Sequence, residues 1–220
     1  MKRIKDIREM FIEKLKSEDF VIDKSGVKTI ELVGESYIVD EDIIFGTLNT
    51  DYAKKEVQWY LSQSLNVYDI PKTPLIWKQV CDKDGNINSN YGWCIFSEEN
   101  GSQYKNCIRE LRKNKDTRRA MMIYTRPSMH TDYNKNGMSD FMCTNNVQIL
   151  IRNNKLNYIL NQRSCDSIFG FKNDIYWAKF VHNKILEDLK EDYPELELGD
   201  LIHQVGSLHV YERHFELVKG

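Results

Sequence analysis

The sequence has no long apolar run. A membrane-spanning helix needs about 18 or more apolar residues in succession, and no stretch of this chain reaches that length. Residues 1–6 also lack the apolar core of a signal peptide. We therefore expect a chain with no membrane association that works in the cytoplasm.

An excess of one charge is also absent. The chain carries 31 Lys and Arg residues against 33 Asp and Glu residues, a net charge of -2. A protein that wraps nucleic acid needs a basic field over much of its surface, so this composition disfavours such a role. A small anionic ligand that is bound by a few local cations suits the same balance.

Cysteine is present but not paired: its 5 residues include no CxxC spacing. They stand at positions 81, 94, 107, 143 and 165. An odd number without paired spacing is not typical of a disulfide scaffold or of a zinc site. We expect free thiols in a reducing compartment and no bound metal.

Internal repeats, low-complexity tracts and linkers rich in Pro, Gly or Ser are missing, and only 4 prolines occur in 220 residues. This uniformity predicts a single domain over residues 1–220. The hydrophobic content of 41% is enough to build a sizeable core at this length.

Helices and strands are mixed along the chain. The segments predicted to be helical are 4–15, 52–64, 102–112, 175–189 and a short one from residue 212. The segments predicted to be strands are 27–39, 120–124, 143–152, 156–163 and 201–211. Asn153-Asn154 predicts a hairpin turn between two strands, 69–74 a turn and 133–139 a loop. The mixture favours the α+β class.

Cys143 is the candidate nucleophile. A single cysteine is more often a core residue than a catalytic one, but this one precedes Thr144, Asn145 and Asn146 at the start of an apolar strand. Polar side chains there are costly unless they face a site. A thiol reacts as its thiolate and needs a nearby cation, which Arg163 on the partner strand of the hairpin could supply.

Arg163 and Ser164 end an apolar strand and are candidate phosphate ligands. We expect Arg163 to be buried there, and a buried arginine requires an anion. A phosphate suits its planar fork, and the serine hydroxyl adds a donor. Arg118 and Arg119 are a second source of positive charge, although a solvated turn explains that pair equally well.

Other polar residues have plain interpretations as well as functional ones. Asp166 and Asp174 follow the Arg-Ser pair, but Asp174 stands before a predicted helix and suits its N-cap. His209 and Tyr211 share one face of a strand and could bind a sugar hydroxyl, although a lone histidine is more often a core or surface residue. Glu56 by itself would pass as a solvated side chain on a helix.

Together these segments resemble the thymidylate synthase family, and more closely its phage deoxycytidylate (dCMP) hydroxymethylase branch. The resemblance covers nearly the whole chain and implies a large mixed sheet packed with helices, one face of which forms a dimer interface. The segments that carry it are Asp23-Lys24-Ser25-Gly26, Glu56 to Tyr60, Ile76-Trp77, Asn90-Tyr91-Gly92, Thr117-Arg118-Arg119, Met142-Cys143-Thr144, Gln162 to Asp166, Gly170 to Asp174 and His209-Val210-Tyr211. Singly most are weak signals, but their order and spacing are specific.

The resemblance implies a role for each candidate. Cys143 is expected to add to C6 of a pyrimidine, and Glu56 to organise water and proton transfers. The expected nucleotide ligands are Lys24, Arg163, Ser164, His209 and Tyr211, with Arg118 and Arg119 lent by the neighbouring subunit of an obligate homodimer. The folate co-substrate, 5,10-methylenetetrahydrofolate, is expected to lie against Trp77, Asp166 and Gly170.

Three positions depart from the synthase pattern. Thr144 replaces the histidine that follows the nucleophile, and Lys24 replaces a phosphate-binding arginine and loses its fork. Asp174 replaces the asparagine that binds the uracil edge. A carboxylate accepts from N4 of cytosine, and a proton shared with N3 satisfies the second position. Asp174 therefore favours cytosine as the base.

The implied reaction is hydroxymethylation of dCMP at C5, in which water rather than hydride completes the product. Thymidylate synthase and a hydroxymethylase of the ribonucleotide CMP are alternatives of the same fold. A non-catalytic nucleotide- or RNA-binding protein is an alternative of another class, which the set Glu56, Cys143, Arg163 and Asp174 disfavours. The branch also suggests a phage protein in the host cytoplasm, with other nucleotide-synthesis enzymes as partners.

Family members usually continue beyond the position of Lys219-Gly220 with a tail that closes over the folate. We expect either that this tail is missing from the chain or that closure is achieved differently. Closure often excludes water and completes a site. A form without the tail is expected to bind nucleotide yet to turn over poorly.

Overall fold

The computed structural model describes residues 1–22 and 26–219, so the predicted phosphate ligand Lys24 lies outside the described residues. The chain forms two compact units. Unit 1 comprises Met1–Leu48 and Arg152–Gly220, and unit 2 comprises Asn49–Ile151. The single domain over residues 1–220 stays a prediction.

Unit 1 is built on a mixed sheet. Its strands are β1 (Lys2–Arg3), β2 (Val21–Ile22), β3 (Lys28–Ile38), β6 (Lys155–Asp166) and β7 (Glu197–Tyr211). Strand β7 lies between β3, to which it is antiparallel, and β6, to which it is parallel. Short β1 runs parallel to β3, and β2 pairs antiparallel with it. This mixture of directions confirms the predicted α+β class.

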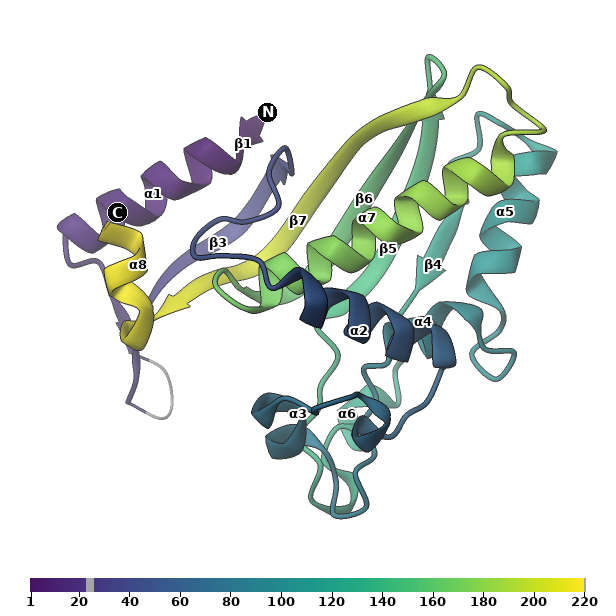
Figure 1. The fold of residues 1–220 in the computed structure, drawn as a ribbon. Helices are drawn as coiled ribbons and strands as arrows, with labels where there is room; N and C mark the ends of the chain where they lie inside the picture. Colours follow the sequence, from purple (N-terminus) through teal and green to yellow (C-terminus); the bar gives the residue numbers. More distant parts are fainter. Residues whose placement is uncertain (23–25, 220) are drawn as a thin grey trace. The chain divides into compact units, whose positions relative to one another are not determined.

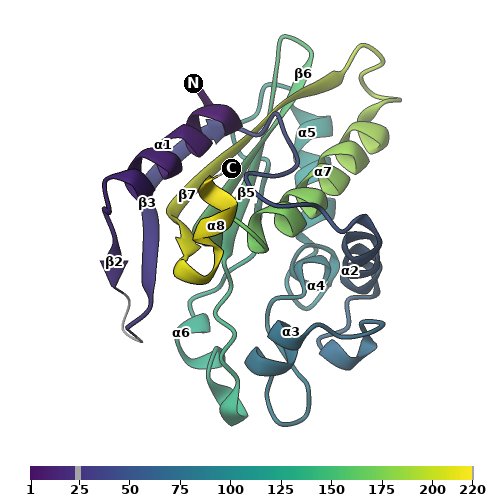
Figure 2. The same ribbon diagram turned by 60° about the vertical axis from the view of Figure 1, so that its left-hand side comes forward.

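Helices cover this sheet. They are α1 (Ile4–Lys16), α7 (Gly170–Leu189) and α8 (Phe215–Lys219), with a 3-10 turn η3 (Glu212–His214) before α8. The long helix α7 lies along β6 and β7 (Figure 1) and buries Phe171, Ile175 and Val181. Helix α1 packs on β3 (Figure 2) and buries Ile4 and Phe11. Burial of these apolar side chains is the main favourable term in forming this layer.

A crease crosses three neighbouring strands of the sheet. In β6 the buried side chains alternate with less buried ones up to Gln162, and the next buried side chain is Cys165. The alternation of buried and less buried side chains therefore shifts by one residue at Arg163, and we call this shift the crease. The same shift occurs at Gly34 in β3 and Gly206 in β7, and the strand register places these residues at one level. A Cβ on Gly206 would lie 2.8 Å from the Arg163 carbonyl oxygen, so glycine is required there. At the crease Arg163 is exposed, so the prediction that this arginine is buried is wrong.

Unit 2 is mostly helical. Its elements are α2 (Thr50–Ser62), η1 (Val67–Asp69), α3 (Leu75–Val80), α4 (Tyr91–Phe96), α5 (Gln103–Lys113), β4 (Met121–Ile123), α6 (Met129–Asp132), η2 (Lys135–Gly137) and β5 (Thr144–Arg152), whose last residue belongs to unit 1. Strands β4 and β5 pair antiparallel. Helix α4 contacts both α2 and α5. A Cβ on Gly92 would lie 1.8 Å from the Tyr60 carbonyl oxygen, so the backbones of α4 and α2 touch.

The helices and strands predicted from the sequence are present, with shifted ends. The largest shift is in α7, which begins at Gly170 and has Phe169 at its N-cap position. Asp174 therefore lies in the second turn of the helix, and its interpretation as the N-cap is wrong. Asn153 and Asn154 both have a positive φ, 51° and 57°, as a two-residue hairpin turn requires.

The six-residue helices α3 and α4 and the turns of α6 and η2 were not predicted, because so few residues show no clear period. None of the helices within the described ranges combines the length and apolar character that a bilayer span demands.

Candidate active site

Asp174 has the most strongly shifted pKa among the carboxyl groups of the described part of unit 1. It projects from α7 toward β6, where the Gln162 amide donates a hydrogen bond of 2.8 Å to its Oδ2. The residue keeps some exposed surface, but desolvation of its carboxyl group dominates and raises the pKa to about 7. The charge of Asp166 raises it further, and the Gln162 hydrogen bond opposes both. Burial therefore favours the protonated form of this carboxyl group.

The ends of β6 and β7 bring other predicted residues to the same region. Asp166 is the register partner of His209, and its Oδ1 accepts a 2.8 Å hydrogen bond from the Ile168 amide. Burial lowers the pKa of His209, and the nearby Asp166 partly opposes that effect. The imidazole is therefore neutral at pH 7. Its ring meets that of Tyr211 edge to face, with centroids 4.9 Å apart, so both side chains lie on one face as predicted.

The predicted phosphate ligands stand beside this group. Ser164 is half-buried, and Arg163 is exposed at the crease. Gly170 begins α7 next to them, and a Cβ there would make an ordinary 3.6 Å contact with the Asp166 side chain. Unit 1 thus places the predicted phosphate-binding pair, a neutral histidine and a protonatable acid on adjoining elements.

Glu56 is buried in unit 2, with 5% of its surface exposed. Its carboxylate accepts hydrogen bonds from the Tyr52 hydroxyl and from the Trp77 indole, the latter at 3.2 Å. The same indole lies 3.2 Å from the Tyr52 hydroxyl. A buried carboxylate needs such donors, and the interpretation of Glu56 as a solvated side chain is wrong. The structure brings the predicted pair Glu56 and Trp77 together.

Tyr52 was missed in the sequence analysis. Its only signal was the spacing of four residues from Glu56, which places both side chains on one face of α2. The helix begins at Thr50 and is capped by Asn49, whose side chain accepts a 3.0 Å hydrogen bond from the Tyr52 amide. That cap fixes the first turn and with it the position of the tyrosine.

Cys143 lies directly before β5, outside regular secondary structure, and is half-buried. Its thiol points toward the Phe141 carbonyl oxygen, 4.0 Å away. Burial raises the pKa of Cys107 to about 12 and raises that of Cys94 as well, which disfavours their reactive thiolates. Accessibility therefore separates Cys143 from these two cysteines of unit 2, whereas Cys81 is also half-buried.

Arg118 and Arg119 are exposed on the segment before β4. Their backbone is held: the Thr117 hydroxyl accepts from the Arg119 amide at 3.1 Å, and the Arg118 carbonyl accepts from the Gln148 side chain at 2.9 Å. Neither guanidinium has a hydrogen-bond or ion-pair partner among the described residues. Such a fixed backbone with two outward cations suits an anion held from outside the unit.

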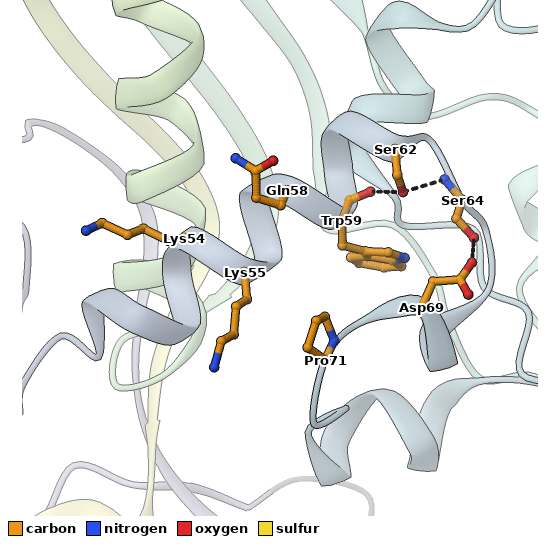
Figure 3. Close-up of a pocket in the computed structure, with 8 residues that line it drawn as sticks. All are labelled: Lys54, Lys55, Gln58, Trp59, Ser62, Ser64, Asp69 and Pro71. Atoms are coloured by element: carbon orange, nitrogen blue, oxygen red, sulfur yellow. Dashed lines mark hydrogen bonds between the residues drawn. The ribbon is translucent and has the colours of Figure 1, made fainter.

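A cavity of about 560 Å³ in unit 2 neighbours these residues, because the ring of its lining residue Trp59 lies 5.3 Å from that of Trp77. It is lined by Lys54, Lys55, Gln58, Trp59, Ser62, Ser64, Asp69 and Pro71. Figure 3 shows the Trp59 ring beside Pro71, with the Ser64 hydroxyl donating to Asp69 at 2.5 Å. None of the predicted site residues lines this cavity, so its size does not identify it as the active site. Within the described ranges, no group of three or more His, Cys, Asp or Glu residues could hold a metal ion.

Comparison with known proteins agrees with this fold. The thymidylate synthase family model matches residues 12–220. A thermostable thymidylate synthase A from Bacillus subtilis superposes with a TM-score of 0.70 at 20% identity, covering 96% of this chain and 82% of that one. The mixed sheet with its helices is therefore the thymidylate synthase fold.

Some proteins found by sequence comparison are more similar to this chain than that solved structure is. The deoxycytidylate 5-hydroxymethyltransferases of Enterobacteria phages T6 and T4 are 57% and 56% identical over 207 residues, which is 93% of this chain and 84% of each relative. A thymidylate synthase of Francisella tularensis subsp. holarctica is 28% identical over 174 residues, 74% of this chain and 62% of that protein. The chain belongs to the thymidylate synthase family.

Asp174→Asn is expected to change how stability depends on pH. Since the native pKa of about 7 exceeds the ordinary value, the folded protein binds more protons than the unfolded chain between about pH 4 and about pH 7. The free energy of unfolding therefore falls as pH rises through this window. An amide does not titrate, so the variant lacks this loss of stability. The free energy of unfolding of the variant minus that of the wild type should therefore increase by about 1–3 kcal/mol from about pH 5 to about pH 8.

Urea unfolding at these two pH values measures that gain. Asp200→Asn, which removes an exposed carboxylate from β7, is the matched control for the loss of one charge. If the difference in unfolding free energy between Asp174→Asn and the wild type is equal at both pH values, the pKa of Asp174 is not raised.

Proposed function

We propose that this chain is a deoxycytidylate 5-hydroxymethyltransferase. It transfers the one-carbon unit of 5,10-methylenetetrahydrofolate to C5 of dCMP with addition of water, giving 5-hydroxymethyl-dCMP and tetrahydrofolate. The observation that carries this proposal is the acid Asp174, with a pKa of about 7, at the position where the resemblance places the asparagine of synthases. The names of the phage relatives point to the same substrate.

Asp174 accounts for the choice of base. Cytosine offers an N4 amino donor beside an N3 acceptor, so its partner must accept at one atom and donate at the next. A protonated carboxyl group does both. Gln162 donates to Oδ2, which keeps that oxygen an acceptor and leaves the proton on Oδ1. Oδ1 then donates to N3, while Oδ2 accepts from N4.

Uracil presents the opposite pattern, with an N3 donor and an O4 acceptor. A neutral acid could bind it only in another orientation, and a carboxylate would face O4. Buried mispaired edges of this kind discriminate by about 10⁴-fold or more. Donation to N3 also draws electrons from the ring and makes C6 a better electrophile, so Asp174 serves both selection and activation.

Covalent activation makes the ring nucleophilic. The Cys143 thiolate adds to C6, and the electron pair of the C5–C6 double bond makes C5 enamine-like. C5 then forms a bond to the one-carbon unit. Loss of the C5 proton and departure of tetrahydrofolate leave an exocyclic methylene on the nucleotide. Water adds to that methylene, and the thiolate leaves C6, so the folate is not oxidised.

Glu56 places the water. Its carboxylate is fixed by Tyr52 and Trp77, and a carboxylate within hydrogen-bond reach of a water can act as its general base. We assign the folate to Trp77, Asp166 and Gly170. The half-buried indole and the half-buried acid suit a flat heterocycle with hydrogen-bond donors.

The nucleotide phosphate and sugar use the remaining residues. Arg163 and Ser164 bind the phosphate, with Lys24 as a further ligand, and His209 and Tyr211 bind the 3′-hydroxyl. The proposed homodimer supplies Arg118 and Arg119 from the neighbouring subunit. The exposure of Val33, which is 75% exposed on β3, supports an interface on the unit 1 sheet.

Incubation of the protein with dCMP and methylenetetrahydrofolate is expected to yield a product 30 mass units heavier, about the mass of one CH₂O group added to the ring. No absorbance change for dihydrofolate should accompany it, because no hydride leaves the folate. Mass spectrometry and absorbance spectroscopy measure the two. Formation of dihydrofolate would indicate a thymidylate synthase. A preference for CMP over dCMP in competition would indicate a ribonucleotide enzyme, and the absence of turnover would indicate a binding protein.

Cys143→Ser is expected to abolish exchange of the C5 hydrogen of dCMP with solvent, because exchange requires addition at C6. The release of tritium from 5-tritiated dCMP measures it. Cys81→Ser, at the other half-buried cysteine of unit 2, should retain exchange. If Cys143→Ser exchanges at the wild-type rate, Cys143 is not the nucleophile.

Asp174→Asn is expected to shift preference from dCMP toward dUMP. An amide can donate to O4 and accept from N3–H of uracil but cannot supply a proton to N3 of cytosine. The ratio of kcat/KM for the two nucleotides should fall by about 10²-fold or more. A variant that still strongly prefers dCMP would show that Asp174 does not select the base.

A further inference from the structure

Asp140 is a buried acid that the mechanism above does not use. It stands three residues before Cys143 and exposes only 7% of its surface. Its Oδ2 accepts hydrogen bonds from the amides of Asn88 at 2.7 Å and Ser89 at 2.8 Å. Its Oδ1 accepts from the Ser89 hydroxyl at 2.7 Å. Bonds to a charged acceptor are stronger than neutral ones, so this is a firm junction.

The side chain of Asn88 makes further hydrogen bonds that hold this junction in place. The Asn88 side chain donates to the Asp140 carbonyl at 3.1 Å and accepts from the Arg126 guanidinium at 2.9 Å. Arg126 also pairs with Asp132 at 3.0 Å and lies over the Trp93 ring. Asn88 is therefore fixed from two directions, and its backbone has little freedom to follow a displaced Asp140.

Asn90 connects the same segment to the helix that carries Glu56. It is fully buried, and its amide donates to the carbonyl oxygens of Trp59 at 3.1 Å and Ser64 at 2.8 Å. Its Oδ1 accepts from the Trp93 amide at 2.8 Å and caps α4. Residues Asn88, Ser89 and Asn90 thus form a bridging segment, with α2 at one end and the Cys143 segment at the other.

The Cys143 segment needs such an anchor. Residues 139–143 lie between η2 and β5, where no strand ladder holds the backbone. Their backbone is also held by the Ser139 amide, which donates to the Val80 carbonyl at 2.8 Å, and by the Asp140 amide, which donates to the Tyr133 carbonyl at 3.0 Å. Closer to Cys143, Met142 is fully buried and has its sulfur 3.7 Å from that of Cys94, a contact that is weaker and less directional than three hydrogen bonds to a carboxylate. Asp140, which is bonded through its amide, its carbonyl and its carboxylate, is therefore a strong anchor of the segment.

We propose that Asp140 is a positioning residue for Cys143, and that the bridging segment fixes the thiol relative to Glu56. This rests on the proposed function, in which one residue attacks C6 and the other places water. A displacement of about 1 Å in a reacting group costs about 10²-fold in rate. Asp140 thereby acts on catalysis without touching the nucleotide.

Asp140→Asn tests this, because the amide nitrogen of the new side chain is a donor and cannot accept the hydrogen bonds that the carboxylate accepts from Asn88 and Ser89. We expect kcat to fall by about tenfold or more, with the KM for dCMP changed less than about twofold. We also expect Cys143 to be alkylated by iodoacetamide at a rate changed by about threefold or more, measured by peptide mass mapping without dCMP or folate.

Asp82→Asn is the matched control. Asp82 is equally buried in unit 2, at 7% exposure, and also accepts three hydrogen bonds, but they come from Asp84 and Asn86 of its own turn. Its variant should lose similar thermal stability and leave kcat and Cys143 alkylation unchanged. If Asp140→Asn folds and changes both quantities no more than Asp82→Asn does, the proposal is overturned.

Ser89→Ala covers the case in which Asp140→Asn does not fold, because it removes one of the three bonds and leaves the backbone donors. We expect kcat to fall by about threefold or more at unchanged KM, and a wild-type kcat would overturn the proposal. The alkylation assay separates this test from the proposed function. If Cys143→Ser retains exchange while Asp140→Asn changes alkylation, the positioning stands and the assignment of the nucleophile fails.

Discussion

The account depends on the burial of one carboxyl group. Water would hold an aspartate ionised at neutral pH, but desolvation between α7 and β6 moves the pKa of Asp174 to about 7. In the proposed complex, this shift lets one side chain donate to N3 and accept from N4 of cytosine. The Gln162 hydrogen bond opposes the shift, and in the proposal it leaves the proton on Oδ1. Position and protonation therefore come from the same packing.

The two units provide different kinds of support. In unit 1, the site residues stand at the ends of long strands, and the crease at Gly34, Gly206 and Arg163 directs successive side chains to new faces. In unit 2, Glu56 and Cys143 stand on a helix and an irregular segment. Buried polar side chains replace the strand ladder there: the bridging segment Asn88 to Asn90 connects the two elements through its hydrogen bonds.

Much of the fold could be predicted from sequence, because periodicity reports burial of long elements directly. The α+β class, the helix at α1 and the strand that includes His209 and Tyr211 followed from it. The environments of Glu56 and Arg163 could not, since they depend on Tyr52, Trp77 and the crease, which are tertiary. The start of α7 was wrong because Gly170 to Asn173 have no apolar period. The set of site residues came from the family resemblance, and Asp140 gave no sequence signal.

The most direct measurement is the titration of the Asp174 carboxyl group by carbon-13 NMR, with Asp174→Asn to assign the resonance. The account predicts a midpoint near pH 7 in the free protein, as burial requires, and a protonated carboxyl group at that pH once dCMP is bound. A midpoint near the ordinary value of about 4, unchanged by dCMP, would contradict the central claim that this acid selects cytosine through its proton.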